Sequence, residues 1–114
     1  MNTPGTWTIR GEVKMNYLEI IELRSIGKDI SILEKNLTLF LKEIKNTYKS
    51  YRVYLYHHAL IETDWSFHIH FQSDIPVNSP SSLGIRIAGV LRDFGLVNHS
   101  LWSNKHENML GMVL

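Results

Sequence analysis

The chain has 114 residues, of which 44% are hydrophobic, so it fits one globular domain and is too apolar for a disordered chain. Its net charge of +1 provides neither the basic patch expected for nucleic-acid binding nor a polybasic membrane anchor. The absence of cysteine excludes disulfides, thiolate catalysis and cysteine-type zinc sites.

No apolar stretch approaches the roughly 20 residues that a helix needs to cross a bilayer. Residues 1–14 carry no apolar segment with basic flanks and no small-residue cleavage site, so we expect a cytoplasmic protein without a membrane partner. Residues 1–15 are expected to form an N-terminal arm or an extra strand around Trp7-Thr8-Ile9, ahead of a single domain at 16–104.

The first strand is predicted at Tyr17–Arg24, where Glu19 and Glu22 fall on opposite faces and leave the inward side open to either assignment. From Asp29 to about Lys45, apolar residues recur on one stripe at helical spacing. This pattern predicts an amphipathic helix with Asp29 as a candidate N-cap, and a capping box of Ser31 and Glu34 as the competing start.

A β-hairpin is predicted at residues 51–73, where apolar and polar residues alternate on both sides of Glu62-Thr63-Asp64. A three-residue loop there sets Ile61 opposite Trp65 and gathers the apolar residues on one face, with His57 as the polar exception. We expect His57 to be a hydrogen-bonded histidine of the core or sheet end. The reverse face then pairs Leu60 with Ser66, His58 with His68, Tyr56 with His70, and Tyr54 with Gln72. A shift by one residue would mix the two sets, which favours this alignment.

The second helix is expected to have Ser79 as N-cap, Pro80 as its first residue and Gly95 as a left-handed C-terminal cap. The last strand is predicted at Leu96–Ser103. One of its faces holds Val97, His99 and Leu101, and the other holds Asn98, Ser100 and Trp102. The tail at 105–114 ends in the apolar Met109–Leu114, which we expect to dock on the domain or on a neighbouring subunit.

The predicted order is β-α-β-β-α-β, and two helices with one apolar stripe each can cover only one side of a sheet. This pattern predicts a ferredoxin-like α+β fold: a four-stranded antiparallel-type sheet with the first and third strands in the centre. The aromatic face beginning at Trp65 should lie under the helices. The uncovered face should hold Tyr54, Tyr56, His58, His68 and His70.

Two kinds of chemistry fit that uncovered face. His68 and His70 have the spacing that sets two imidazoles side by side on a strand, and His58 opposite them would supply a third nitrogen. Such a set suits zinc, or non-haem iron if Glu19 or Glu22 adds a carboxylate.

The other interpretation needs no cofactor. One of His58, His68 and His70 acts as general base, while Tyr54, Tyr56 and Gln72 line the site and orient a small aromatic substrate. The same side chains could instead be a solvated, hydrogen-bonded surface. RNA binding through this topology is disfavoured, because the predicted third strand has no glycine and its aromatic residues belong to the covered face.

The element order, the length and the bare polar-aromatic face, over Asn16–Ser103, resemble the dimeric α/β-barrel proteins, in particular the antibiotic-biosynthesis-monooxygenase type. The resemblance is one of architecture and assigns no site residue. It implies that two subunits pair sheet to sheet; some members oxidise quinols or aromatic polyketides without metal or flavin, and others bind haem.

We therefore expect a homodimeric, small-molecule-binding protein that acts as a cofactor-independent monooxygenase on a small aromatic compound or quinol. The alternative is a metal protein with Zn or Fe at His58, His68 and His70. The second alternative is a non-catalytic interaction or assembly domain, so the sequence leaves open whether the protein is an enzyme.

Overall fold

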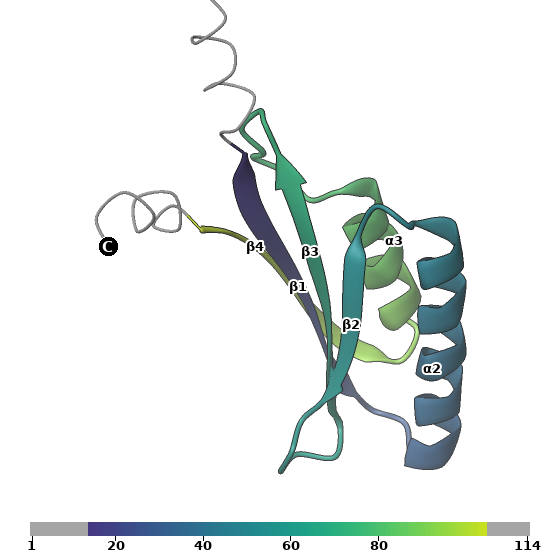
Figure 1. The fold of residues 1–114 in the computed structure, drawn as a ribbon. Coiled ribbons are helices and arrows are strands. Elements are labelled where there is room, and N and C mark those ends of the chain that lie inside the picture. The colour runs from purple at the N-terminus through teal and green to yellow at the C-terminus, as the bar shows by residue number, and fades with distance from the viewer. Residues whose placement is uncertain (1–13, 105–114) are drawn as a thin grey trace, which may run out of the picture.

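The computed structural model describes residues 14–104, whose elements follow the order β-α-β-β-α-β (Figure 1). They are β1 (Met15–Ser25), α2 (Ile30–Thr47), β2 (Arg52–His57), β3 (Asp64–Ser73), α3 (Ser82–Leu91) and β4 (Gly95–Asn104). The strands form one antiparallel sheet in the order β2-β3-β1-β4, and both helices lie on the same side of it. The predicted ferredoxin-like fold is confirmed, with β1 and β3 in the centre.

The expected strand-like segment Trp7-Thr8-Ile9 and the expected tail at 105–114 lie outside the described residues. Within residues 14–104, no helix is both long and apolar enough to cross a membrane.

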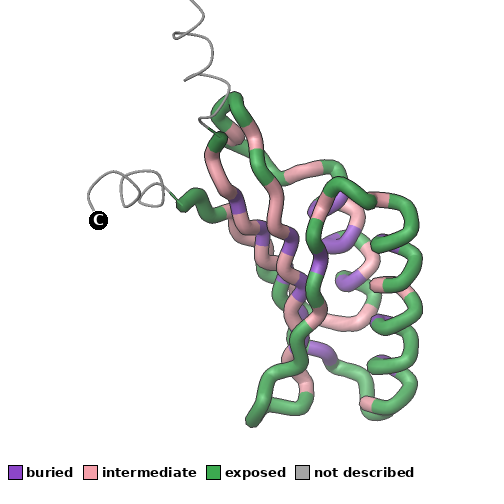
Figure 2. The backbone as a smooth tube through the Cα atoms, viewed as in Figure 1, coloured by how far each residue is buried: buried purple, intermediate pink, exposed green. Residues whose placement is uncertain are grey.

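The core is built from buried residues of the sheet and of the two helices that cover one side of it (Figure 2). The strands contribute Tyr17, Glu19, Ile21, Leu23, Val53, Trp65, Phe67 and Ile69. The helices contribute Leu33, Leu37, Ile44, Leu83, Ile87, Ala88 and Leu91. The aromatic face of β3 lies under the helices as predicted, which leaves the opposite side of the sheet uncovered by the described residues.

Of the N-caps predicted for the two helices, one is confirmed and the other is wrong. Asp29 caps α2, because its Oδ1 accepts a hydrogen bond of 3.1 Å from the N–H of Ile32. The cap of α3 is Ser81 rather than Ser79, since the Ser81 Oγ accepts from the N–H of Gly84 at 3.0 Å. The N–H of Ser81 in turn donates to Glu19 Oε1 at 3.1 Å, so a buried carboxylate of β1 fixes where this helix begins.

Gly95 is not the predicted left-handed cap. No glycine among the described residues has a positive φ. The C-cap of α3 is Arg92, whose N–H donates to the carbonyl of Ala88, and Gly95 is the first residue of β4. A Cβ at Gly95 would overlap the carbonyl oxygen of Arg24 on β1. The glycine is therefore explained by the close approach of two paired strands rather than by a turn.

The predicted hairpin alignment is wrong, although the faces of its strands are right. Leu55 lies opposite Phe67 instead of Phe71, so each β2 residue meets a β3 residue four positions earlier than predicted. The connection is longer than three residues, because β2 ends at His57 and β3 begins at Asp64. A displacement by an even number keeps every strand side chain on its predicted side of the sheet.

Candidate functional site

Side chains cross the uncovered side of the sheet, here called the open face, in rows set by the strand pairing. From β2 to β4, the rows are Arg52-His70-Leu18-Trp102, Tyr54-His68-Ile20-Ser100 and Tyr56-Ser66-Glu22-Asn98. The central strands thus supply an apolar and imidazole floor. The two edge strands supply aromatic residues on either side of it.

On the β2 side, the tyrosines pack against the imidazoles. The rings of Tyr56 and His68 have centroids 4.6 Å apart, and Tyr54 meets His70 edge to face at 5.5 Å. On the β4 side, Trp102 is 59% exposed and its Nε1 donates to Ser100 Oγ at 2.9 Å, which orients the indole. A flat ligand on this floor would have aromatic rings on both sides.

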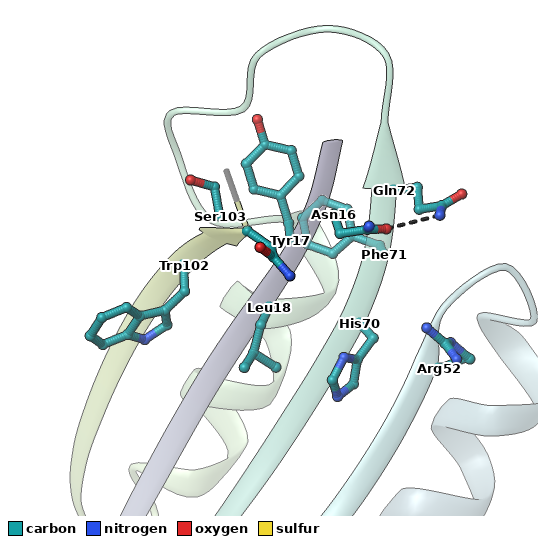
Figure 3. Close-up of a pocket in the computed structure, with 10 residues that line it drawn as sticks. Asn16, Tyr17, Leu18, Arg52, His70, Phe71, Gln72, Trp102 and Ser103 are labelled. Atoms are coloured by element: carbon teal, nitrogen blue, oxygen red, sulfur yellow. Dashed lines mark hydrogen bonds between the residues drawn. The ribbon is translucent and has the colours of Figure 1, made fainter. Parts of the chain in front are cut away.

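Two open hollows lie on this face. The Arg52 hollow, of about 530 Å³, is lined by Asn16, Tyr17, Leu18, Arg52, His70, Phe71, Gln72, Trp102, Ser103 and Asn104 (Figure 3). The His68 hollow, of about 740 Å³, includes Ile20, Glu22, Tyr56, His58, Ser66, His68, Ser100 and Trp102 among its lining residues. Because Trp102 lines both, it lies at their boundary.

The predicted site residues are split between these hollows. His70 and Gln72 line the Arg52 hollow, whereas Tyr56 and His68 line the His68 hollow. Tyr54 lines neither and lies on the β2 edge, where its ring contacts those of Tyr56 and His70. Gln72 Nε2 donates to Asn16 Oδ1 at 2.8 Å, so this amide is held in place on the floor.

His58 is displaced from its predicted position opposite His68. It lies just beyond β2 at the rim of the His68 hollow, and its Nδ1 accepts from the N–H groups of Leu60 and Ile61, both at 3.0 Å. This local turn satisfies the loop backbone and ends the strand early. His57, by contrast, is the sheet-end histidine that was predicted: it stacks on Trp65 at 3.9 Å and hydrogen-bonds to the carbonyl of Glu62.

The three-histidine metal set therefore does not form across the hairpin. Within the described part of the chain, no group of three or more His, Asp or Glu residues is arranged to hold a metal ion. Of the two candidate carboxylates, Glu19 points under the helices, while Glu22 lies on the open face and accepts from Asn98 Nδ2 at 3.1 Å. His68 and His70 remain as a pair on one strand face.

His68 has the electrostatics of a neutral base. Burial lowers its pKa below the ordinary value of 6.5; the positive charge of His70 lowers it further, and the negative charge of Glu22 opposes both effects. His68 makes no hydrogen bond within residues 14–104, so a ring nitrogen is available to take a proton at neutral pH.

Two contributors to the open face, Arg52 and Trp102, were not proposed as site residues from the sequence. The buried Glu19–His99 pair was not predicted either, since Glu19 was considered only as a metal ligand. Arg52 and Trp102 could have been found by extending the two-residue period of their strands onto the open face. The alternation of β1 puts Glu19 on the same face as the buried Tyr17 and Ile21. Because Glu22 falls on the other face, the sequence did not show which of the two glutamates is buried.

No protein-family model and no curated protein sequence matches this chain.

Proposed function

We propose that the open face binds a small planar aromatic compound with an acidic hydroxyl group, and that a second copy of the chain closes the site. One observation carries the proposal. A partly buried His68, whose pKa is lowered by burial, lies beside an apolar floor with aromatic residues at both edges. A flat apolar surface can bind the ring of a phenol or quinol, and one base beside it can take the proton of the hydroxyl.

The floor and walls would hold the ring. Leu18 and Ile20 on β1 are half-buried and offer apolar contact from below. Trp102 on one side and Tyr56 on the other, 59% and 51% exposed, offer ring faces and edges. Aromatic pairs of this kind contribute about 0.5–1.5 kcal/mol beyond the burial of their area.

His68 would then take the proton of the ligand hydroxyl, because neutral imidazole accepts a proton and the resulting phenolate is electron-rich. With a hydroquinone as substrate and dioxygen as oxidant, one oxygen atom forms a new C–O bond on the ring, giving a hydroxyquinone. The other oxygen atom leaves as water with two of the hydrogens of the hydroquinone. Dioxygen takes up all the electrons that the ring loses, so this reaction needs neither metal nor flavin.

The second copy is supported by the apolar surface that the described residues leave uncovered. Leu96 and Trp102 on β4 are 72% and 59% exposed, and Tyr56 on β2 is 51% exposed, all on the open face. A second copy that covers these side chains would remove their apolar surface from water. Two copies related by a twofold axis would place two such faces against each other and exclude water from the ligand.

The test combines mass, oxygen uptake and one pair of variants. Light scattering should give twice the 13.3 kDa chain mass, and a panel of hydroquinones should consume equimolar dioxygen and yield hydroxyquinones. Trp102→Ala, which removes an aromatic side chain from the open face, should raise the KM for hydroquinones. Ile85→Ala removes an equally exposed apolar side chain (58%) from α3 and should leave turnover unchanged.

The outcomes separate the candidate functions. Hydroquinone turnover that is lost in His68→Gln supports the base. Ligand binding without turnover reduces the protein to a binding module. A dimer with neither binding nor turnover contradicts the proposal and leaves an assembly domain, and a stoichiometric Zn or Fe that is lost in His68→Gln would favour the metal protein instead.

A further inference from the structure

We propose that the ligand of the open face is an aromatic acid, whose carboxylate is bound by Arg52 at the opposite end from the hydroxyl that faces His68. This inference rests on the proposed function and specifies the chemical class of its ligand. It is carried by the charge distribution of the Arg52 hollow.

Arg52 is a cation without an ionic partner among residues 14–104. It lies on β2 directly opposite His70 and lines the Arg52 hollow (Figure 3). The other arginine of the open face is already occupied: Arg24 binds Asp64 through two hydrogen bonds, Nε to Oδ1 at 3.0 Å and Nη2 to Oδ2 at 2.9 Å. Of these two arginines, Arg24 is thus paired with a carboxylate of the sheet, whereas Arg52 lines the Arg52 hollow without such a partner among residues 14–104.

The lining of the Arg52 hollow suits an anion. Its residues include one arginine, one histidine, several amide and hydroxyl groups, and no Asp or Glu. The carboxylates of this face, Glu22 and Asp64, line the His68 hollow instead. Arg24 also lines the His68 hollow and neutralises Asp64, so Glu22 is the carboxylate left there without a cation among the described residues. An anion is therefore favoured at the Arg52 end of the face, which gives a ligand its direction.

The spacing of the two ends suits a ligand of one or two fused rings. Arg52 pairs with His70, and His68 lies two residues further along the same strand, so Arg52 and His68 are diagonal neighbours. Such neighbours have Cα atoms about 7–8 Å apart in an antiparallel sheet. Arginine binds a carboxylate through two parallel N–H donors, which adds direction to the charge attraction.

The test uses three fluorescent naphthalenes: a hydroxynaphthoate with its hydroxyl and carboxylate on different rings, the methyl ester of that acid, and naphthol. Wild-type protein should bind the acid about 10- to 100-fold more tightly than the ester, the range expected of a hydrogen-bonded charge pair. Arg52→Gln should remove that preference while leaving the affinity for ester and naphthol unchanged. Arg92→Gln is the control, because it removes an exposed arginine that lines neither hollow of the open face.

The results distinguish this inference from the proposed function. If ester and naphthol bind but the acid has no advantage, or if Arg92→Gln weakens the acid as much as Arg52→Gln does, the carboxylate assignment is wrong and the aromatic site stands. If Arg52→Gln weakens all three compounds equally, Arg52 shapes the site without selecting charge, and the assignment is also wrong. If none of the three binds, both proposals fail.

Discussion

His99 Nε2 lies 2.7 Å from Glu19 Oε2, and the Glu19 side chain has no exposed surface. The other oxygen of this carboxylate accepts the N–H of Ser81, the cap residue of α3. One buried side chain of β1 therefore connects β4 to the start of a helix. Neither residue lines the two hollows of the open face, so we assign the pair to the packing of α3 and not to the ligand site.

Breaking this pair should be costly, because removal of one partner leaves the other buried without it. Glu19→Met and His99→Leu should each lower the free energy of unfolding by about 3 kcal/mol. The double variant should cost less than the two single costs together by at least about 1 kcal/mol. Urea denaturation of the four proteins measures this coupling.

The same cycle on Arg24 and Asp64 provides a control, since this pair is bidentate but its arginine is 62% exposed. Solvent screens exposed pairs, so its coupling should be much smaller. Costs at Glu19 and His99 that simply add would mean that the two side chains do not stabilise each other.

Gly84 on α3 is required by the Glu19–His99 pair. A Cβ at this position would overlap the carboxylate of Glu19 and come within 3.0 Å of His99 Nε2. Gly84→Ala should therefore destabilise the protein by about 1–3 kcal/mol, as overpacked cores do. Gly89→Ala is the matched control, because nothing lies within 4 Å of a Cβ there. It should stabilise by about 0.5–1 kcal/mol through helix propensity. Thermal unfolding of both variants measures these changes, and equal shifts in Tm would contradict the proposed crowding at Gly84.

The faces of the strands could be predicted from the sequence because side chains alternate with a fixed period. This period placed Tyr54, Tyr56, His68 and His70 on the uncovered side, and it separates His99 from Trp102 on β4. An error in alignment by an even number of residues does not disturb such an assignment. For this reason the fold and the sides of the β2, β3 and β4 side chains followed from local patterns, whereas the inward side of β1 did not.

The alignment across the hairpin could not be predicted in the same way. It depends on the length of the loop, and the alternation of side chains does not show the contacts that set this length. His58 Nδ1 accepts two loop N–H groups, and Arg24 on β1 binds Asp64 at the start of β3. The start of α3 has a similar cause, since Ser81 is selected over Ser79 by a carboxylate from a strand 62 residues away. Both errors arise where tertiary contacts override local propensity.

The pKa of His68 should depend on the charges of its neighbours on the open face. Burial and the charge of His70 lower its pKa below 6.5, and Glu22 acts in the opposite direction. In NMR titrations of the imidazole C–H resonances, His70→Gln should therefore raise the pKa of His68, and Glu22→Gln should lower it further. Both substitutions lie on exposed or half-buried positions, so the fold should tolerate them. A wild-type pKa above 6.5 would contradict the assignment of His68 as a neutral base.

The same shift gives a direction to the pH dependence of stability and of binding. Because the folded-state pKa of His68 is lower than that of the unfolded chain, the unfolded chain binds this proton first as the pH falls below about 6.5. Stability should therefore decline on the acid side, and His68→Gln should flatten that decline. If His68 accepts the ligand proton, affinity for naphthol should also fall as His68 becomes protonated, while affinity for the methyl ether of naphthol, which has no proton to give, should stay constant. An equal loss for both compounds would show that acid acts on the fold and not on the base.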